Sequence, residues 1–333
     1  MFRSKIPIEQ LNYDKIKIHS FSKPSKKYKI FVSIASFRDE ELESTLIDLY
    51  TKAKHPESIR TFCLMQTSNE DPFNINPYTT KLKIFSIDFG EVNATLSKGV
   101  CWARALCQQQ LLNEKYFLQI DSHMRFAQDW DASLVELLHE TEDSKAILSC
   151  YPPAYQPNNT NLIPAIIYNK TISFEDNHSP KLKGHIINSD LEYEKHKLHQ
   201  WISAGFFFTY ANFCKEIPYD PYHYFIGEEI DITTRAYTRN WNSYAPKKCL
   251  IWHYYYIKED NTRVLHWDAD SNWIRLSQLS DERVKLKLKI ITKEDCNDES
   301  KKNIDLFKLG EDRTLEDFQS ELGINFKNKS INK

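Results

Sequence analysis

The chain has 333 residues, and its formal net charge of -2 arises from acidic and basic side chains that are mixed along the sequence. Such a length can bury a large core, while near-neutral charge without a basic patch excludes the electrostatic signature of a nucleic-acid-binding protein. No stretch reaches the ~20 apolar residues that cross a bilayer, and the N-terminus lacks a secretory apolar core, so we expect no transmembrane segment.

Periodic apolar residues predict alternating strands and helices along the chain. Residues 1–27 are polar and lysine-rich, which predicts a leader lying over the surface of a catalytic domain that spans 28–257. The expected strands are 29–35, 61–66, 83–87, 116–120 and 146–150. The expected helices are 41–54, 99–112, 131–140 and 227–239. This alternation predicts an α/β fold with a mixed, mostly parallel sheet flanked by helices.

Later parts of the chain show a weaker pattern. Residues 151–200 are rich in proline and asparagine, which predicts loops and short strands that shape an acceptor site. Aromatic residues gather after residue 200, and three of them are candidates for apolar walls beside a sugar or for ordinary core packing: Trp201, Phe206 and Tyr224. We expect residues 258–333 to form a small C-terminal extension packed on the catalytic domain.

A pair of potential metal ligands, Asp121 and His123, directly follows the strand expected at 116–120, and His253 ends another apolar run. No glycine-rich phosphate motif follows any expected strand, so a cation is the obvious partner for a bound diphosphate. Carboxylate and imidazole ligands suit a divalent cation, with Mn2+ as the natural occupant and Mg2+ as the alternative. Taken alone, the pair is also compatible with a polar loop or cap, and His253 with a core histidine.

Five segments occur in a distinctive order: 30–41, 99–105, 118–126, 225–231 and 251–254. They resemble the motifs of the polypeptide N-acetylglucosaminyltransferase family, whose best-known members modify hydroxyproline on a cytoplasmic ubiquitin-ligase adaptor protein. Residues 309–315 and 323–325 resemble the closing segment of that family, so the resemblance runs from about 29 to 325. The metal motif is also similar to that of the mucin-type polypeptide N-acetylgalactosaminyltransferases. The resemblance implies a GT-A nucleotide-sugar fold, a UDP-sugar donor, a divalent metal and a retaining transfer.

Roles for individual residues follow from this resemblance. It implies metal ligation by Asp121, His123 and His253, contact with the uridine by Ser36, Arg38 and Asp39, and contact with the donor by Arg104. Alternatives are an ion pair or cap for Arg38 and Asp39, and a solvated helical arginine for Arg104. Gly205 permits close backbone approach, for example by the donor sugar.

Two adjacent carboxylates, Glu228 and Glu229, are the candidate catalytic residues. One of them is expected to contact sugar hydroxyls or the acceptor hydroxyl, and which one stays open. Helix capping and the helix dipole offer the alternative explanation for both. Without a clear nucleophile, front-side attack is the expected route, with double displacement through either glutamate as the alternative.

UDP-N-acetylglucosamine is the expected donor, and a hydroxyl on a protein or glycan is the expected acceptor. Competing functions are a polysaccharide-pathway transferase using a different UDP-hexose, a non-catalytic UDP-sugar or glycan-binding protein, and a metal-dependent hydrolase. Seven scattered cysteines lack the close pairs of a zinc or redox motif, so we expect buried thiols in the reducing cytoplasm. The oligomeric state is left open.

Overall fold

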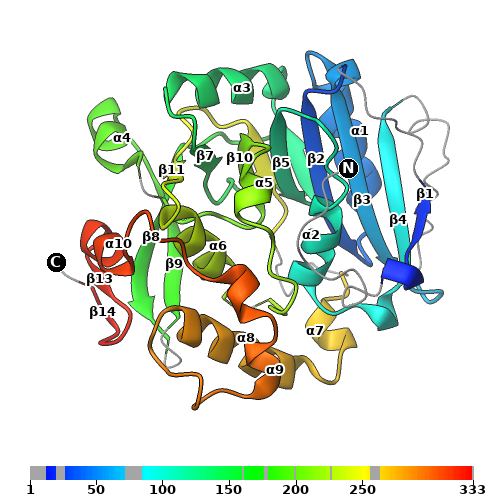
Figure 1. Ribbon diagram of the computed structural model, residues 1–333. Helices are drawn as coiled ribbons and strands as arrows, with labels where there is room; N and C mark the ends of the chain where they lie inside the picture. Colours follow the sequence, from blue (N-terminus) through cyan, green and yellow to red (C-terminus); the bar gives the residue numbers. More distant parts are fainter. Residues whose placement is uncertain are drawn as a thin grey trace.

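The computed structural model describes residues 13–19, 27–71, 85–159, 161–175, 179–198, 200–225, 227–255 and 263–331. An eight-stranded sheet with the order β1-β4-β3-β2-β5-β10-β7-β11 forms its centre (Figure 1). Its strands are β1 (Lys17–His19), β2 (Ile30–Phe37), β3 (Ile59–Thr67), β4 (Ile87–Asn93), β5 (Tyr116–Asp121), β7 (Ala146–Ser149), β10 (Phe206–Tyr210) and β11 (Asn242–Tyr244). Strands β4, β3, β2 and β5 run parallel, whereas β10 is antiparallel to both β5 and β7. The predicted mixed, mostly parallel sheet is confirmed.

Helices cover both faces of this sheet because successive side chains of its strands point to opposite sides. Within β2, Ile30, Val32 and Ile34 join the core beneath α1 (Leu42–Thr51) and α3 (Trp130–Glu140). Phe31 joins the opposite core. That second core contains residues of α2 (Val100–Gln108), α5 (Phe213–Glu216) and α6 (Glu228–Tyr237).

One expected strand was misplaced. The apolar run at 83–87 ends where β4 begins, at Ile87, and residues 83 and 84 lie outside the described part of the chain. Asp88 interrupts the apolar pattern of β4, yet it is buried because Arg60 of β3 donates to its carboxylate at 2.9 Å. A buried ion pair between distant residues therefore concealed this strand from the sequence pattern.

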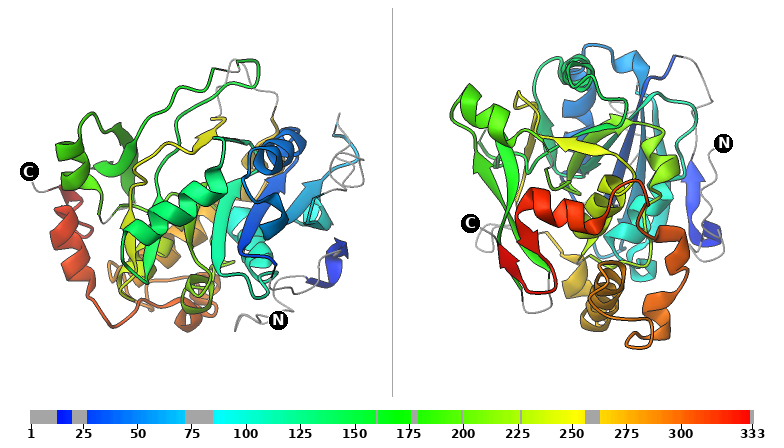
Figure 2. Two further views of the ribbon diagram at one scale, coloured as in Figure 1. Left: turned by 90° about the horizontal axis from the view of Figure 1, so that it is seen from above. Right: turned by 60° about the vertical axis from the view of Figure 1, so that its left-hand side comes forward.

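Three small sheets complete the β structure of the described residues. Strand β6 (Met124–Phe126) pairs antiparallel with β12 (Ile251–His253), which sets His253 opposite Met124. The region expected to contain short strands forms a hairpin of β8 (Ile167–Phe174) and β9 (Pro180–Ile186), followed by α4 (Asp190–His196). Strands β13 (Ile324–Asn325) and β14 (Ser330–Ile331) pair near the C-terminus, and β14 lies beside β8 (Figure 2).

The C-terminal segment is mainly helical. Its helices are α7 (His266–Ala269), α8 (Trp273–Lys287), α9 (Asp298–Lys301) and α10 (Leu315–Leu322). Short 3-10 helices span Tyr13–Lys15, Pro56–Ser58, Ala94–Leu96 and Ile304–Phe307. A shared core joins Trp201 and Ile230 of the catalytic region to Val284 of α8 and Phe318 of α10. This segment therefore packs directly against α6.

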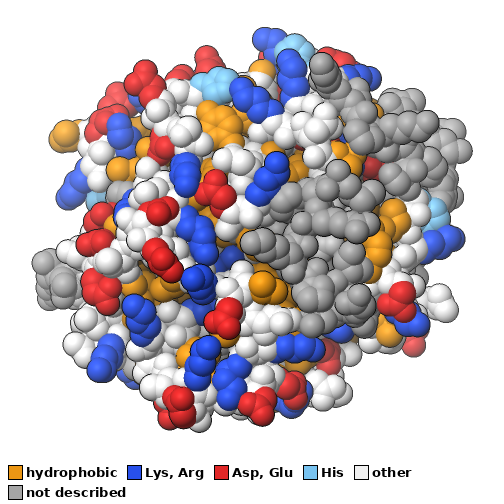
Figure 3. Space-filling model, viewed as in Figure 1, with side chains coloured by type: hydrophobic (Ala, Val, Ile, Leu, Met, Phe, Trp, Pro, Cys, Tyr) orange, Lys and Arg blue, Asp and Glu red, His pale blue; other side chains and the backbone are white. Residues whose placement is uncertain are grey.

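Residues expected to form the leader include β1, which pairs with β4 and forms one edge of the eight-stranded sheet. Most of that segment lies outside the described residues. On the face seen in Figure 3, basic and acidic side chains are interspersed, in agreement with the near-neutral net charge. Among the described helices, none combines the length and apolar character that a membrane crossing requires.

Candidate active site

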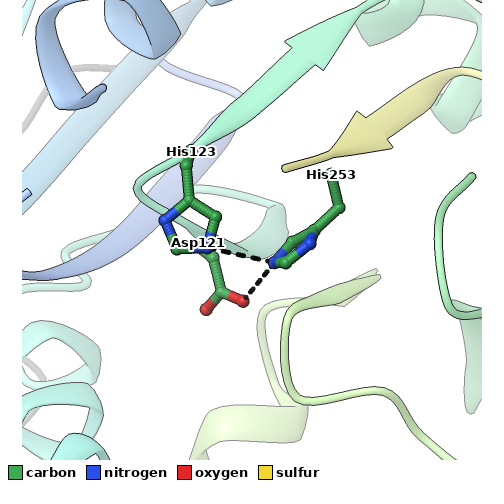
Figure 4. Close-up of side chains that lie close together, drawn as sticks. All are labelled: Asp121, His123 and His253. Atoms are coloured by element: carbon green, nitrogen blue, oxygen red, sulfur yellow. Dashed lines mark hydrogen bonds and ion pairs between the residues drawn. The ribbon is translucent and has the colours of Figure 1, made fainter. Parts of the chain in front are cut away.

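Asp121, His123 and His253 converge at the carboxyl end of β5 (Figure 4). His253 Nε2 lies 3.1 Å from both Asp121 Oδ2 and His123 Nε2. The pairing of β6 with β12 brings His253 across 130 residues of sequence to this position. Two imidazole nitrogens and a carboxylate oxygen at such separations form a donor set that fits Mn2+ or another divalent cation of similar preference.

Asp39 lies behind His123 and fixes the orientation of its ring. Its Oδ2 is 2.5 Å from His123 Nδ1 and accepts a hydrogen bond from Ser122 Oγ at 2.6 Å, while its Oδ1 accepts from the Glu41 backbone N–H. Burial alone would raise the pKa of Asp39, but His123 and these hydrogen bonds lower it to about 2. A carboxylate at Nδ1 leaves Nε2 free for a metal. Asp39 therefore orients His123, and the uridine contact that the resemblance implies for Asp39 stays a prediction.

Thr45 of α1 holds the turn between the two neighbouring ligands. Its hydroxyl donates to the Ser122 carbonyl at 2.8 Å and accepts from the Met124 N–H at 2.9 Å. All three groups are buried. Helix α1 thus stabilises the backbone that carries His123.

Arg104 connects the metal-ligand group to α6. Its guanidinium donates to Asp121 Oδ1 and to Glu228 Oε1, each at 2.5 Å, and Tyr219 Oη also donates to Glu228. Burial opposes ionisation of Asp121, but Arg104 and His253 hold the pKa of this carboxyl well below its ordinary value. Arg104 is only 4% exposed, which excludes the solvated helical arginine considered from the sequence.

Glu229 has a different environment from its neighbour Glu228. Its carboxylate accepts hydrogen bonds from the Tyr151 hydroxyl and from the Ala204 backbone N–H, and no described residue forms an ion pair with it. Burial raises the pKa of Glu229 to about 7. Among the described residues, therefore, only Glu228 of the two adjacent glutamates is held by a cationic side chain.

Gly205 lies directly against Asp121. A Cβ atom at this position would be 2.6 Å from Asp121 Oδ2, and the Gly205 carbonyl accepts from the Asp121 N–H at 3.3 Å. A larger residue would displace the carboxylate. The sequence predicted that another group could come close to the backbone at Gly205, and in the structure this group is the Asp121 side chain.

A cavity of about 400 Å³ brings most predicted site residues together. Its lining includes Arg104, Asp121, Gly205, Glu228, Glu229 and His253, together with Tyr151, Pro152, Leu182, Phe225 and Tyr255. Trp201 and Phe206, candidates for sugar walls, are instead buried core side chains. Phe225 and Tyr255 are exposed by 46% and 36%, so they offer the accessible aromatic surfaces.

Ser36 and Arg38 lie at the end of β2. Ser36 is buried, and Arg38 donates through Nε to Asp71 Oδ1 at 2.5 Å, so its ion pair is formed with Asp71. Between them, Phe37 lines a second, larger cavity of about 800 Å³. This cavity is also lined by Ser97, Lys98, Trp102, Tyr224 and His266. Tyr224, the third candidate for a wall beside the sugar, thus lines this larger cavity and not the cavity that contains Asp121.

Sequence reasoning missed Tyr151, Tyr219 and Arg263. The two tyrosines hydrogen-bond the candidate glutamates, and the positive charge of Arg263 acts on both Asp39 and His253. None of the three belongs to a recognisable motif, so no local signal identified them.

Comparisons with known proteins define the family. The sequence model of the glycosyltransferase (GlcNAc) family matches residues 29–88 and 70–328. The solved structure of GalNAc-T7 with UDP, GalNAc and Mn2+ matches with a TM-score of 0.62 and 16% identity, covering 88% of this chain and 57% of that chain.

Residues 1–349 of TarS from S. aureus, in complex with UDP-GlcNAc, match with a TM-score of 0.48 and 14% identity, over 83% of this chain and 70% of that chain. None of the curated protein sequences matches. The chain spans little more than half the length of the GalNAc-T7 chain. It has the GT-A fold and belongs to the glycosyltransferase (GlcNAc) family.

Proposed function

We propose that the chain transfers N-acetylglucosamine from UDP-N-acetylglucosamine to a hydroxyl group on a protein or glycan, with retention of configuration and with Mn2+ or Mg2+ as the cofactor. The convergence of Asp121, His123 and His253, with Asp39 behind His123, carries this proposal. The GT-A fold and the family membership support it. GalNAc-T7, whose structure contains UDP, GalNAc and Mn2+, supports the choice of donor class and metal.

The three converging residues would hold the cation. When bound, it supplies positive charge that offsets the charge developing on the diphosphate as the glycosidic bond breaks. Asp39 keeps the proton of His123 on Nδ1, so that Nε2 is available as a ligand. Arg104 keeps Asp121 ionised and directs its other oxygen toward His253.

The two glutamates would then have separate roles. Glu228, held by Arg104 and Tyr219, lies in the cavity wall where it can accept hydrogen bonds from sugar hydroxyls. Glu229 holds the Ala204 backbone beside Gly205 and positions Tyr151. Because both carboxylates are engaged by protein donors, front-side attack is favoured over a covalent glycosyl-enzyme intermediate.

Donor and acceptor would enter from different sides. In this proposal Ser36 and Arg38 contact the nucleoside from the end of β2, where the neighbouring Phe37 lines the larger cavity. The exposed rings of Phe225 and Tyr255, with Leu182 of the β8–β9 hairpin, form the apolar approach for an acceptor. All seven cysteines are unpaired, in keeping with a proposed cytoplasmic location.

A panel of UDP-sugars tests the proposal directly. We expect release of UDP from UDP-N-acetylglucosamine in the presence of Mn2+ and a suitable peptide or glycan acceptor, with loss of turnover after chelation of the metal. His123→Ala should lower kcat/KM by about 100-fold or more, because it removes a ligand from the charge-stabilising cation. His185→Ala, on the β8–β9 hairpin, is the matched control and should keep wild-type activity.

Three outcomes would contradict the assignment. Binding of UDP and Mn2+ without UDP release under any acceptor condition indicates a sugar-nucleotide-binding protein. Cleavage of phosphoesters without a sugar donor indicates a hydrolase. Turnover that persists in His123→Ala and after chelation removes the metal-ligand role.

A further inference from the structure

A second cluster of charged side chains lies behind α6, outside the candidate active site. Asp220, His223 and Asp231 are buried, and their side chains converge. The ammonium group of Lys287, the last residue of α8, lies among them. It donates to Asp220 Oδ2 at 2.6 Å and to Asp231 Oδ1, and its Nζ is 3.4 Å from His223 Nε2. Lys287 thus occupies the position of a central cation.

Two arginines complete the cluster. Arg283 of α8 donates to Asp220 at 2.7 Å, and Arg235 of α6 donates to Asp231 at 2.9 Å. Each carboxylate therefore has one arginine of its own, whereas Lys287 is shared by both. Removing Lys287 would leave Asp220 and Asp231 without the ammonium group that they share, and His223, whose Nε2 is 3.7 Å from an oxygen of each, would remain between them.

The cluster is connected to the active site through the backbone. Asp220 follows Tyr219, whose hydroxyl donates to Glu228. Asp231 lies on the first turn of α6, three residues after Glu228. Lys287 therefore contacts two residues close to Glu228. Asp220 is next to Tyr219, which donates to Glu228, and Asp231 lies on the helix that begins with Glu228.

Helix α8 contacts the intervening loop at two further places. Ser280 Oγ accepts from the Tyr224 backbone N–H at 2.7 Å. Gly227 has φ 86° and a Cβ there would be 2.3 Å from Val284 Cγ2, so the loop and α8 are in close contact just before Glu228. Among the described residues between Tyr219 and Glu228, the contacts with α8 are thus made by Asp220, His223, Tyr224 and Gly227.

We propose that Lys287 is a positioning residue for catalysis, which acts through Asp220 and Asp231 to hold Tyr219 and Glu228 against Arg104. The C-terminal extension then contributes to the active site, because α8 sets the geometry of the segment that leads into α6 at Glu228. The kinetic part of this inference rests on the proposed function. The structural part, that Lys287 holds Tyr219 and Glu228 in place, does not depend on the proposed function.

Lys287→Met provides the kinetic test. We expect kcat to fall by roughly 10- to 100-fold, because displacement of a positioned group by about 1 Å can cost that much, with a smaller change in KM. Lys287→Arg keeps the charge and should recover part of the rate. Lys285→Met, which removes a partly buried ion pair with Asp281 on the same helix, is the matched control and should retain wild-type kinetics.

A double-mutant cycle separates positioning from general destabilisation. If Lys287 acts through Glu228, adding Lys287→Met to Glu228→Gln should cause little further loss of kcat, whereas independent effects multiply. Folded Lys287→Met with wild-type kcat, or full additivity in the cycle, would overturn the proposal. If Lys287→Met does not fold, Ser280→Ala gives the same test at the Tyr224 contact, and unchanged kcat there is the contradicting result.

An activity-independent measurement keeps the two proposals distinguishable. Cys101 is buried on α2 and lies within electrostatic reach of Glu228, Arg104, Asp220 and Asp231. In Lys287→Met, we expect faster thiol labelling of Cys101 and faster hydrogen exchange at 219–225 than in Lys285→Met. Equal rates contradict the positioning role even in a protein without turnover, whereas absence of UDP release from the wild type counts against the proposed function alone.

Discussion

At the scale of single residues, Asp39 and Glu229 are two carboxylates whose surroundings move their pKa values in opposite directions. His123 and Ser122 stabilise the charged form of Asp39, and its pKa is about 2. Glu229 has no cationic partner among the described residues, and burial raises its pKa to about 7. The Asp39 carboxylate is thus a fixed negative charge beside His123, whereas the Glu229 carboxyl, which holds the backbone next to Gly205, can gain or lose a proton near pH 7.

Replacing Asp39 tests the orientation of His123. We expect Asp39→Asn to weaken Mn2+ binding by about 10- to 100-fold, the usual effect of losing a partner behind a metal-bound histidine. Calorimetric titration with Mn2+ measures this. Ser122→Ala removes only a neutral donor to the same oxygen and should have a smaller effect, so equal affinities for Asp39→Asn and the wild type would refute the role.

Glu229→Gln tests the raised pKa. A carboxyl whose pKa rises from an ordinary 4.5 to about 7 on folding stabilises the folded state below pH 4.5, and this contribution is lost as pH rises through 7. Relative to Glu229→Gln, the wild type should therefore lose on the order of 1–2 kcal/mol of unfolding free energy between pH 4.5 and 8, after a discount for partial exposure. Urea denaturation at both pH values measures it, and a constant difference between the two proteins contradicts the assignment.

At the scale of structural elements, the site depends on segments that meet at the carboxyl end of β5. Strand β5 supplies Asp121, the β6–β12 pair brings His253 beside His123, and the turn before β10 lies against Asp121. Parallel strands β2 and β5 end side by side, which also places Asp39 near His123. The positions of Asp39, Asp121 and His253 relative to one another therefore depend on the register of the β2–β5 and β6–β12 pairs.

Gly205→Ala tests the contact between the turn and β5. The added Cβ would lie 2.6 Å from Asp121 Oδ2, so the carboxylate or the turn must move. We expect reduced Mn2+ affinity and turnover with little change in the circular dichroism spectrum. Gly184→Ala, whose Cβ would lie 2.9 Å from Ile167 Cγ2 in the β8–β9 hairpin, is the control for crowding away from the site. Equal metal affinity in both variants argues against the contact.

At the scale of the whole molecule, several buried or partly buried histidines have pKa values below the ordinary value. Burial lowers the pKa of His223 from its ordinary value, and lowers those of His253 and His266 to about 4. These residues lie in different places: behind α6, in the metal-ligand group and in the larger cavity. Acid should therefore weaken the extension and the catalytic region together.

Loss of stability at mildly acidic pH is the expected consequence. Because the folded pKa values are depressed, the unfolded chain takes up protons first as pH falls below about 6.5, so the free energy of unfolding decreases from there toward pH 4. Denaturation curves at pH 7.5 and 5 without metal measure the change. His266→Phe, compared with the wild type, should show a smaller decrease. An identical pH dependence in both proteins would show that His266 does not contribute.

Local features explain what could be predicted. The run 116–120 is apolar because β5 is covered on both faces, and the polar residues after it mark the end of the strand. The sequence alone therefore indicated Asp121 and His123 as candidate metal ligands. Strand β4 was misplaced because Asp88 is buried through Arg60, a partner 28 residues away. Similarly, the role of Asp39 depends on His123, 84 residues further along the chain.

The amino-acid sequence by itself determined the α/β fold class and the identity of the metal-ligand candidates, because apolar periodicity and ligand chemistry are properties of neighbouring residues. Only the tertiary structure decided that Asp39 orients His123, that Arg104 holds Glu228 and not Glu229, and that Lys287 joins the extension to α6. These assignments depend on burial and on contacts between residues distant in the chain, and folding alone creates both.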